Sequence, residues 1–264
     1  MTAEFPVYSI TKTFLTQAIL ELGIPLDSKI GDHLAGLDPI YSACKIENLL
    51  NHTAGLSDYS QLPEYAQAVA SKEPAWCREE LLAKALKLPN NHDGFHYSNV
   101  GYLLLRMLLE QKTNLTMFQA IRELVLEPLD ILGFKEWEEE SNLVPGYDPK
   151  WVYSGTFLAT ETAILDGYLA LIQHRSQTTG LQTGLTPVPY PNTGFDNPDY
   201  GFGIMCDVDT ESNEPLFVGH GGGGPGFAHM ILLSTKTWKI AIESSTSDFN
   251  QTDAILRLRE ITSR

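Results

Sequence analysis

The sequence predicts an α+β fold, with a single domain over residues 1–264 in which a helical region packs on an antiparallel sheet flanked by helices. Two observations favour this class. Apolar residues recur at helical spacing in many segments before residue 172, and short β-type runs separated by turns follow near the C-terminus. No linker or low-complexity tract divides the chain. We therefore expect residues 13–205 to be mainly helical with loops, and residues 206–264, together with the N-terminus, to form the sheet region.

The predicted helices begin directly after Ser9. Apolar residues there recur at three- and four-residue steps until Gly23 and Pro25 end the helix. Similar patterns predict helices over residues 46–51, 79–88, 99–110, 117–125 and 160–172. Residues 135–160 and 174–200 are rich in Pro, Gly, Asn, Asp and Thr, so we expect long surface loops in both segments.

The C-terminal part changes to a β-type pattern. Three strands are predicted over residues 216–218, 229–233 and 239–243, and a closing helix over 252–261. A sheet of three visible strands would be short and would leave one edge unpaired, so a homodimer could cover that edge.

Composition narrows the classes of function. A net charge of −15 repels phosphate backbones, so we expect no nucleic-acid partner. No run of about 18 apolar residues is present, which predicts no membrane span. The three cysteines are widely spaced and form no metal or disulfide pattern, and the first residues lack the features of a signal peptide. We expect a cytoplasmic protein.

Ser9-Ile10-Thr11-Lys12 is the first candidate for chemistry. A serine hydroxyl is a poor nucleophile at neutral pH and needs a nearby base, and Lys12 lies one helical turn from Ser9. The same spacing recurs at Ser42 and Lys45, but only Ser9 precedes a long amphipathic helix. We therefore favour Ser9 as the nucleophile and interpret Ser42 as a surface serine.

Two further stretches carry groups suited to acyl transfer. Tyr97-Ser98-Asn99 offers a phenol that can relay protons and an amide that can hold a carbonyl, although a buried tyrosine before a helix cap has the same pattern. The glycine-rich run from Gly219 to Gly226 lets a ligand approach backbone N–H groups, or forms only a flexible turn. His92 and His96 lack a metalloprotease pattern, so a metal-dependent hydrolase is not expected.

Together these stretches resemble the serine β-lactamase and penicillin-binding protein superfamily. The three signature boxes stand in order as Ser9-Ile10-Thr11-Lys12, Tyr97-Ser98-Asn99 and His220-Gly221-Gly222. Residues 49–56 and 95–102 also resemble family segments, and the similarity extends from Phe5 to about Ser245. The variant boxes are most similar to class C β-lactamases, D-alanyl-D-alanine carboxypeptidases and related esterases.

The resemblance implies a β-lactamase-like fold and a specific division of roles. Ser9 would be acylated, with Lys12 and Tyr97 sharing the base and acid roles, and no metal or organic cofactor would be needed. The groups implied to bind the substrate are Asn99, His220, Gly222 and Gly223. Backbone N–H groups of Ser9 and Gly223 would form the oxyanion hole.

Two departures from the family pattern modify this expectation. We expect the usual N-terminal helix and first strands to be lacking before Ser9, so a truncated, inactive relative that acts as a binding or interaction protein is the alternative. Gly221 stands where members directed at β-lactams usually carry Thr or Ser. We therefore expect a small-molecule ester or amide substrate, with esterase, amidase or D-amino-acid peptidase activity and at most weak β-lactamase activity.

Overall fold

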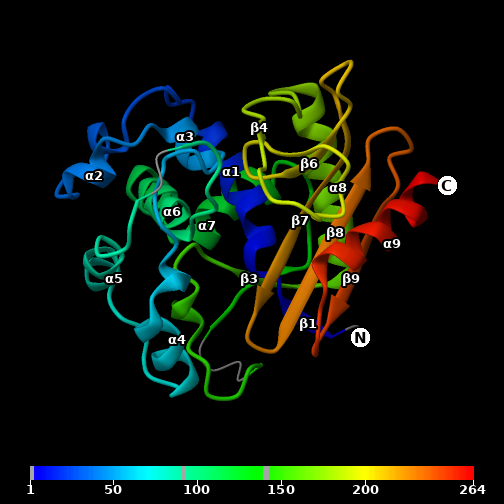
Figure 1. Cartoon of the computed structure of the whole chain (residues 1–264). Helices are drawn as coiled ribbons and strands as arrows, with labels where there is room; N and C mark the ends of the chain where they lie inside the picture. The colour runs from blue at the N-terminus through cyan, green and yellow to red at the C-terminus, as the bar shows by residue number, and fades with distance from the viewer. Residues whose placement is uncertain (1–2, 91–92, 139–142) are drawn as a thin grey trace.

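A computed structural model describes residues 3–90, 93–138 and 143–264 (Figure 1). A helical part lies on one side of the molecule and an antiparallel sheet on the other, and helix α1 (Thr11–Glu21) runs between them. Nearly every side chain of α1 is buried. Some of its polar side chains are hydrogen-bonded inside the core, where the Thr13 hydroxyl donates to the Gly203 carbonyl at 2.7 Å. The helix that follows Ser9 is therefore held from all sides.

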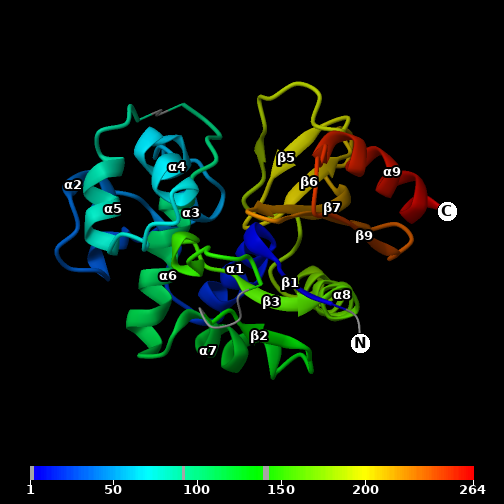
Figure 2. The same cartoon turned by 90° about the horizontal axis from the view of Figure 1, so that it is seen from below.

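The main sheet has six antiparallel strands in the order β4-β5-β6-β7-β8-β9. Their bounds are β4 (Thr186–Pro187), β5 (Pro198–Tyr200), β6 (Met205–Val208), β7 (Pro215–Gly224), β8 (Phe227–Ser234) and β9 (Ile240–Ser245). Helix α9 (Gln251–Ser263) covers one face of the sheet and α8 (Glu161–Gln177) lies on the other (Figure 2). Within the described residues β9 pairs only with β8, so its outer edge is unpaired.

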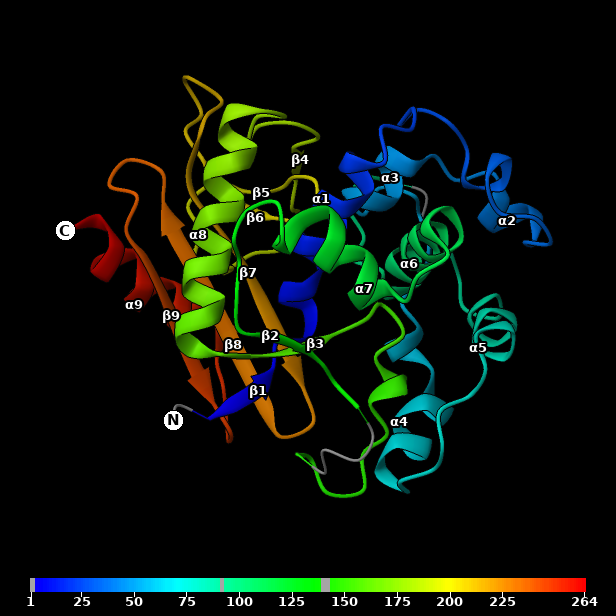
Figure 3. The same ribbon diagram turned by 180° about the vertical axis from the view of Figure 1, so that it is seen from behind.

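A second, three-stranded sheet ties the N-terminus to the middle of the chain. Strand β3 (Phe157–Thr160) lies between β1 (Glu4–Pro6) and β2 (Phe134–Glu136), and both pairs are antiparallel. Figure 3 shows this small sheet beside α8, next to the lower end of the main sheet. Because β1 directly precedes the Ser9 segment, this pairing fixes the entry of α1 into the core.

The remaining helices form the other side of the molecule. They are α2 (Pro39–Ser42), α3 (Ile46–Leu50), α4 (Pro63–Ala70), α5 (Arg78–Ala85), α6 (Asn99–Thr113) and α7 (Met117–Ile121). The longest, α6, starts where the Ser98 hydroxyl accepts from the Gly101 N–H and ends at Asn114, whose φ of 57° is left-handed. Its apolar face packs against α1 and α3. No helix of the described residues is long and apolar enough to cross a membrane.

The predicted α+β class is confirmed, but the extent of β structure differs from the prediction. The sheet has six strands where three were predicted, and the glycine run continues β7 rather than forming a loop at its end. The segments 135–160 and 174–200, expected as loops, contain β3, β4 and β5. Strands of only two to four residues are too short to show a period. Helix α4 was also not predicted.

Candidate active site

Ser9 lies in a single 3-10 turn, Tyr8–Ile10, directly ahead of α1. The turn is tightly held, since the Tyr8 N–H donates to Thr156 Oγ1 at 2.9 Å and the Tyr8 hydroxyl donates to the Pro225 carbonyl at 2.6 Å. Tyr8 has a φ of 46°, a left-handed conformation that costs energy in a residue other than glycine. The backbone beside the candidate nucleophile is therefore strained and clamped.

Lys12 faces Ser9 from the first turn of α1. Its Nζ lies 2.9 Å from Ser9 Oγ, 2.7 Å from Asn99 Oδ1 and 3.4 Å from Ser154 Oγ, and only 1% of the residue is exposed. Burial lowers the pKa of Lys12 to about 7, against the opposing influence of the Asp58 carboxylate. A substantial fraction of this amine is thus neutral at neutral pH and can accept a proton.

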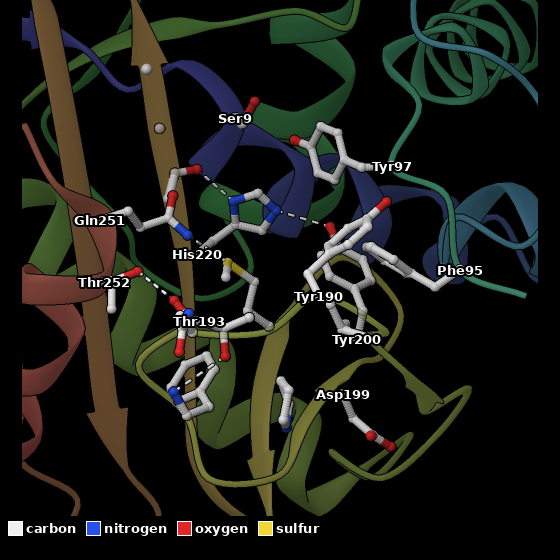
Figure 4. Close-up of a pocket in the computed structure, with 18 of the residues that line it drawn as sticks. Ser9, Phe95, Tyr97, Tyr190, Thr193, Asp199, Tyr200, His220, Gln251 and Thr252 are labelled. Carbon is white, nitrogen blue, oxygen red and sulfur yellow. Dashed lines mark hydrogen bonds between the residues drawn. The ribbon is translucent and has the colours of Figure 1, made fainter.

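Tyr97 lies on the other side of Ser9, and Figure 4 shows its hydroxyl pointing toward the serine. Burial raises the pKa of the Tyr97 phenol far above its ordinary value, and a hydrogen bond with Ser9 offsets only part of that rise. The phenol therefore keeps its proton at neutral pH. Its ring packs against that of His52, with centroids 4.2 Å apart and planes tilted by 36°, and the Lys12 Nζ lies 5.2 Å from the Tyr97 ring centroid.

Asn99 connects Lys12 to a buried carboxylate that sequence reasoning did not identify. Asn99 Oδ1 accepts from Lys12, while its Nδ2 donates to Asp58 Oδ2 at 2.9 Å. Asp58 is only 6% exposed, and its other oxygen accepts from the Ser60 N–H at 3.0 Å. Both ends of the Asn99 amide are therefore occupied, and Asp58 determines which way the amide is oriented.

The glycines of β7 allow the strand to pass against the nucleophile segment. A methyl group on Gly222 would overlap the Val7 carbonyl oxygen, and one on Gly224 would overlap the Tyr8 ring. Gly223 differs, because nothing lies within 4 Å of the place where its Cβ would be. The strand is thus closely packed on both sides of Gly223 and open at Gly223 itself.

His220 belongs to the same strand and is 2% exposed. Its Nδ1 lies 2.6 Å from the Gly221 carbonyl and its Nε2 lies 2.9 Å from the Tyr200 hydroxyl, as the dashed lines in Figure 4 show. Burial, together with the charge of Lys12, lowers the pKa of His220 to about 3 although the Gly221 carbonyl opposes this. The imidazole is neutral, and both of its nitrogens are taken by the protein.

Two cavities open on either side of Ser9. The larger, which we call the β7 chamber, has a volume of about 600 Å³ and lies between β7, β5 and the start of α9, with Tyr200, Met205 and Gln251 in its wall. The smaller, of about 250 Å³, is lined by tyrosines that include Tyr59 and Tyr65. Both cavities are also lined by Ser9 and Gly223. A substrate that reaches the serine can therefore extend in two directions.

The structure brings most of the predicted site residues together. Those gathered around Ser9 or lining the two cavities are Lys12, Tyr97, Asn99, His220, Gly222 and Gly223. The second Ser-Lys pair is elsewhere, because the Ser42 hydroxyl donates to the Pro39 carbonyl and Lys45 pairs with Glu47. His92 lies outside the described residues, and among the residues that are described no three His, Cys, Asp or Glu side chains are grouped to hold a metal ion.

Sequence reasoning missed several residues of this site. They are Asp58, Ser154, Tyr200 and Gln251. Each reaches the site by a long-range contact and carries no local motif. Asp58 had one signal, since it caps a helical turn through the Ser60 N–H, but that signal indicates a structural cap and not an active site.

Comparison with known proteins agrees with this arrangement. Penicillin-binding protein 4* of Bacillus subtilis (strain 168) is 24% identical over 97% of this chain. A putative fimbrial assembly protein, FimD of serogroup D from Dichelobacter nodosus, is 34% identical over 43% of the chain. This chain spans 64% of the length of the first relative and 29% of the second.

Solved structures share the fold. A D-stereospecific amidohydrolase from Streptomyces sp. matches all of this chain and 88% of its own, with a TM-score of 0.76 and 21% identity. The D-amino acid amidase from Ochrobactrum anthropi SV3 matches 98% of this chain and 86% of its own, with a TM-score of 0.76 and 19% identity. The octameric penicillin-binding protein homologue from Pyrococcus abyssi matches all of this chain and 67% of its own, with a TM-score of 0.75 and 20% identity.

The family model described as Beta-lactamase matches residues 3–261, nearly the whole chain. The fold, the order of the sequence boxes and the gathering of their side chains around Ser9 agree with that match. The chain therefore belongs to the beta-lactamase family, within the serine hydrolase superfamily.

Proposed function

We propose that this protein is a serine hydrolase that cleaves an ester or amide through an acyl-enzyme on Ser9. One observation carries the proposal: a fully buried amine, the Lys12 Nζ, lies 2.9 Å from the Ser9 hydroxyl. A serine needs such a base within hydrogen-bond distance, and burial keeps part of the lysine population neutral. Burying a charged amine destabilises the fold, and this cost favours a catalytic role for Lys12 over a role in an inactive binding protein.

In the acylation step, neutral Lys12 removes the proton of Ser9 as its Oγ attacks the substrate carbonyl. Negative charge then forms on the carbonyl oxygen, and the backbone N–H groups of Ser9 and Gly223 would receive it. The protonated phenol of Tyr97 gives its proton to the leaving group as the ester or amide bond breaks. Lys12, now an ammonium, returns a proton to Tyr97. The products of acylation are therefore the acyl-enzyme and a neutral leaving group, with Lys12 and Tyr97 back in their starting protonation states.

Deacylation follows the same route with water as the nucleophile. Water loses its proton to Lys12 as it attacks the acyl carbon, and Ser9 regains a proton when its bond to the acyl group breaks. Asp58 acts through Asn99, because it orients the Asn99 amide against the Lys12 amine, and Asn99 itself lines the smaller cavity and would contact the substrate there. The neutral, fully hydrogen-bonded His220 acts as a support for β7 and transfers no proton.

The substrate class that fits this arrangement is a small ester or amide. Gly221 offers no hydroxyl to a substrate carboxylate, which favours an esterase, an amidase or a D-amino-acid peptidase over an efficient β-lactamase. Two of the structural relatives are a D-stereospecific amidohydrolase and a D-amino acid amidase, which makes amides of D-amino acids the first compounds to test.

The homodimer expected from the sequence would use the unpaired edge of β9.

Covalent labelling tests the nucleophile. The protein is incubated separately with a fluorophosphonate and with a penicillin, and adducts are located by intact-mass spectrometry and peptide mapping. We expect one adduct, on Ser9. Ser9→Ala should lose both the adduct and turnover and keep its thermal stability, because the change deletes one hydroxyl at a partly open site.

The matched control is Ser42→Ala, which removes a serine with the same spacing to a lysine. Ser42→Ala should keep both labelling and turnover. An adduct that survives in Ser9→Ala, or disappears in Ser42→Ala, would show that the nucleophile is misassigned. A folded protein that forms no adduct with either reagent would instead be a non-catalytic relative.

A further inference from the structure

The β7 chamber, which opens beside Ser9, has a wall without a positive charge. Among the described residues that line it there is no Lys and no Arg, and its one carboxylate is Asp199. Two imidazoles also reach it, but burial lowers the pKa of His220 to about 3 and that of His229 to about 4, so both are neutral at pH 7. The smaller cavity likewise has no Lys or Arg among the described residues of its wall.

Aromatic and apolar side chains make up most of the chamber. Phe95, Tyr190 and Tyr200 lie together on its β5 side (Figure 4), and Met205 also lines the chamber. The Phe95 ring centroid lies 5.4 Å from that of Tyr200 and 5.9 Å from that of Tyr190. The rings are tilted or edge-on to one another, and together they give an aromatic wall against which an apolar or aromatic group can pack.

Gln251 supplies an uncharged polar group at the β7 side of the chamber. It is the first residue of α9, and a Cβ on Gly221 would lie 2.5 Å from its Oε1. The carboxamide therefore occupies the space that a side chain at position 221 would take. An amide can donate to or accept from a neutral substrate, but it cannot neutralise a carboxylate.

We propose that the β7 chamber binds an uncharged aromatic or apolar group of the substrate, that Gln251 is a specificity-determining residue, and that the enzyme discriminates against substrates carrying a carboxylate there. This inference rests on the proposed hydrolysis at Ser9 and names the substrate class. A carboxylate entering the chamber would lose its water without gaining a cation, and it would face Asp199 as well as a protein of net charge −15.

The test uses matched nitrophenyl esters of phenylbutanoic acid. One ester is neutral, the second carries a carboxylate on the phenyl ring of the acyl group, and the third carries it on the nitrophenol. Rates are divided by each ester's spontaneous hydrolysis, which removes differences in intrinsic reactivity. We expect kcat/KM for the neutral ester to exceed that of both carboxylated esters by roughly ten- to hundred-fold.

Gln251→Lys adds the missing cation to the chamber. The preference is the kcat/KM of the neutral ester divided by that of a carboxylated ester. In Gln251→Lys this ratio should fall by about tenfold for one of the two carboxylated esters, the one whose charged ring enters the chamber. Gln173→Lys is the matched control, because it adds the same charge at an exposed position of α8, on the opposite side of the sheet from α9. Its preference ratio should stay as in the wild type.

The outcomes separate this inference from the proposed function. Equal rates for all three esters, a preference for a carboxylated ester, or a change in ratio that Gln173→Lys reproduces would overturn the chamber assignment while hydrolysis at Ser9 stands. Where turnover is slow, the same ratio can be measured as the rate of Ser9 acylation by mass spectrometry. A protein that neither hydrolyses nor is acylated by any ester would overturn the proposed function and the chamber assignment together.

Discussion

Lys12 carries an amine that is almost fully buried, beside a serine that lines two cavities. The phenols and imidazoles around it are held neutral, since burial raises the pKa of Tyr97 and Tyr102 and lowers that of His52 and His220. Among the described residues near it, Asp58 supplies the negative charge that opposes the desolvation of Lys12. The pKa of Lys12 is therefore set by two opposing effects: burial lowers it and the Asp58 carboxylate raises it.

That balance predicts a pH profile. Because the reaction needs neutral Lys12 in the free enzyme, kcat/KM should rise as the pH increases through about 7 and level off above it. Asp58→Asn removes the carboxylate that raises the pKa of Lys12, so the rise should move to lower pH; the asparagine has one acceptor oxygen and can keep only one of the two hydrogen bonds that Asp58 accepts from Asn99 and Ser60. The measurement is kcat/KM for one ester between pH 5 and 9.

Asp166→Asn provides the control for this profile. It removes the same charge from an exposed position on α8 and should leave the midpoint unchanged. A midpoint that stays in place in Asp58→Asn, or that moves to higher pH, would contradict the role of Asp58 as the carboxylate that raises the pKa of Lys12.

Residues of the site could be predicted from the sequence only where the motif is local. Ser9 lies in the 3-10 turn that leads into α1, about one turn ahead of Lys12, and the Tyr97-Ser98-Asn99 box leads directly into α6. Ser154 and Tyr200 contact the site across about 140 and 20 residues of chain, respectively, and no spacing rule connects them to it. Asp58 was hidden for a different reason, because its capping of a turn already gives it a structural explanation.

At the scale of one element, β7 shows why a glycine run can be a strand. Its first half carries side chains, but from Gly221 to Gly224 the strand is bare and is held by pairing with β8, whose residues 229–233 are buried. Glycines present no alternating side chains, so the sequence predicts a strand only over residues 216–218 and leaves the glycine run open between a segment that a ligand can approach and a flexible turn. The apolar pattern that indicates a sheet here is in β8, the strand with which the glycine half of β7 pairs.

The two central glycines of this run give a matched pair of variants. Gly222→Ala should push β7 away from the Val7 carbonyl and lower the free energy of unfolding by about 1–3 kcal/mol. Gly223→Ala meets no atom within 4 Å and should change it by less than about 0.5 kcal/mol. Urea denaturation measures both. Equal losses in the two variants would contradict the close approach of β7 to the Ser9 segment.

The helices were easier to predict than the strands. Segments with several turns, such as α1, α6 and α8, repeat their apolar spacing often enough to be recognised, and their bounds differ from prediction by a few residues. The short strands β2 to β5 have two to four residues each and are defined only by their partners. Strand pairing joins residues that are far apart in the sequence, so no short stretch of sequence reveals it.

For the whole molecule, the helical part and the sheet share one core. A single cluster of buried side chains extends from Phe5 to Leu233 and includes α1, α6 and β8. The sequence predicted this unity from the absence of a linker, but it could not show that α1 lies between the two parts. Because α1 packs between the helical part and the sheet, we expect that the two parts do not unfold independently.

We therefore expect one cooperative unfolding transition. Tryptophan fluorescence, to which Trp151 contributes from the helical part, and hydrogen-exchange protection of β8 in the sheet should give urea midpoints that agree within about 0.2 M. Two separated midpoints would show that the helical part and the sheet are distinct folding units and that α1 belongs to only one of them.

The pairing of β1 with β3 also bears on how the protein is made. Glu4 pairs with Thr160, and the neighbours of Ser9 come from as far along the chain as Gly223. During translation, Ser9 leaves the ribosome long before Tyr97, Ser154 and β7 exist to surround it. A nascent chain of this protein carries its serine as an ordinary, unreactive hydroxyl, and the proposed nucleophilic site is assembled only once most of the polypeptide has been synthesised.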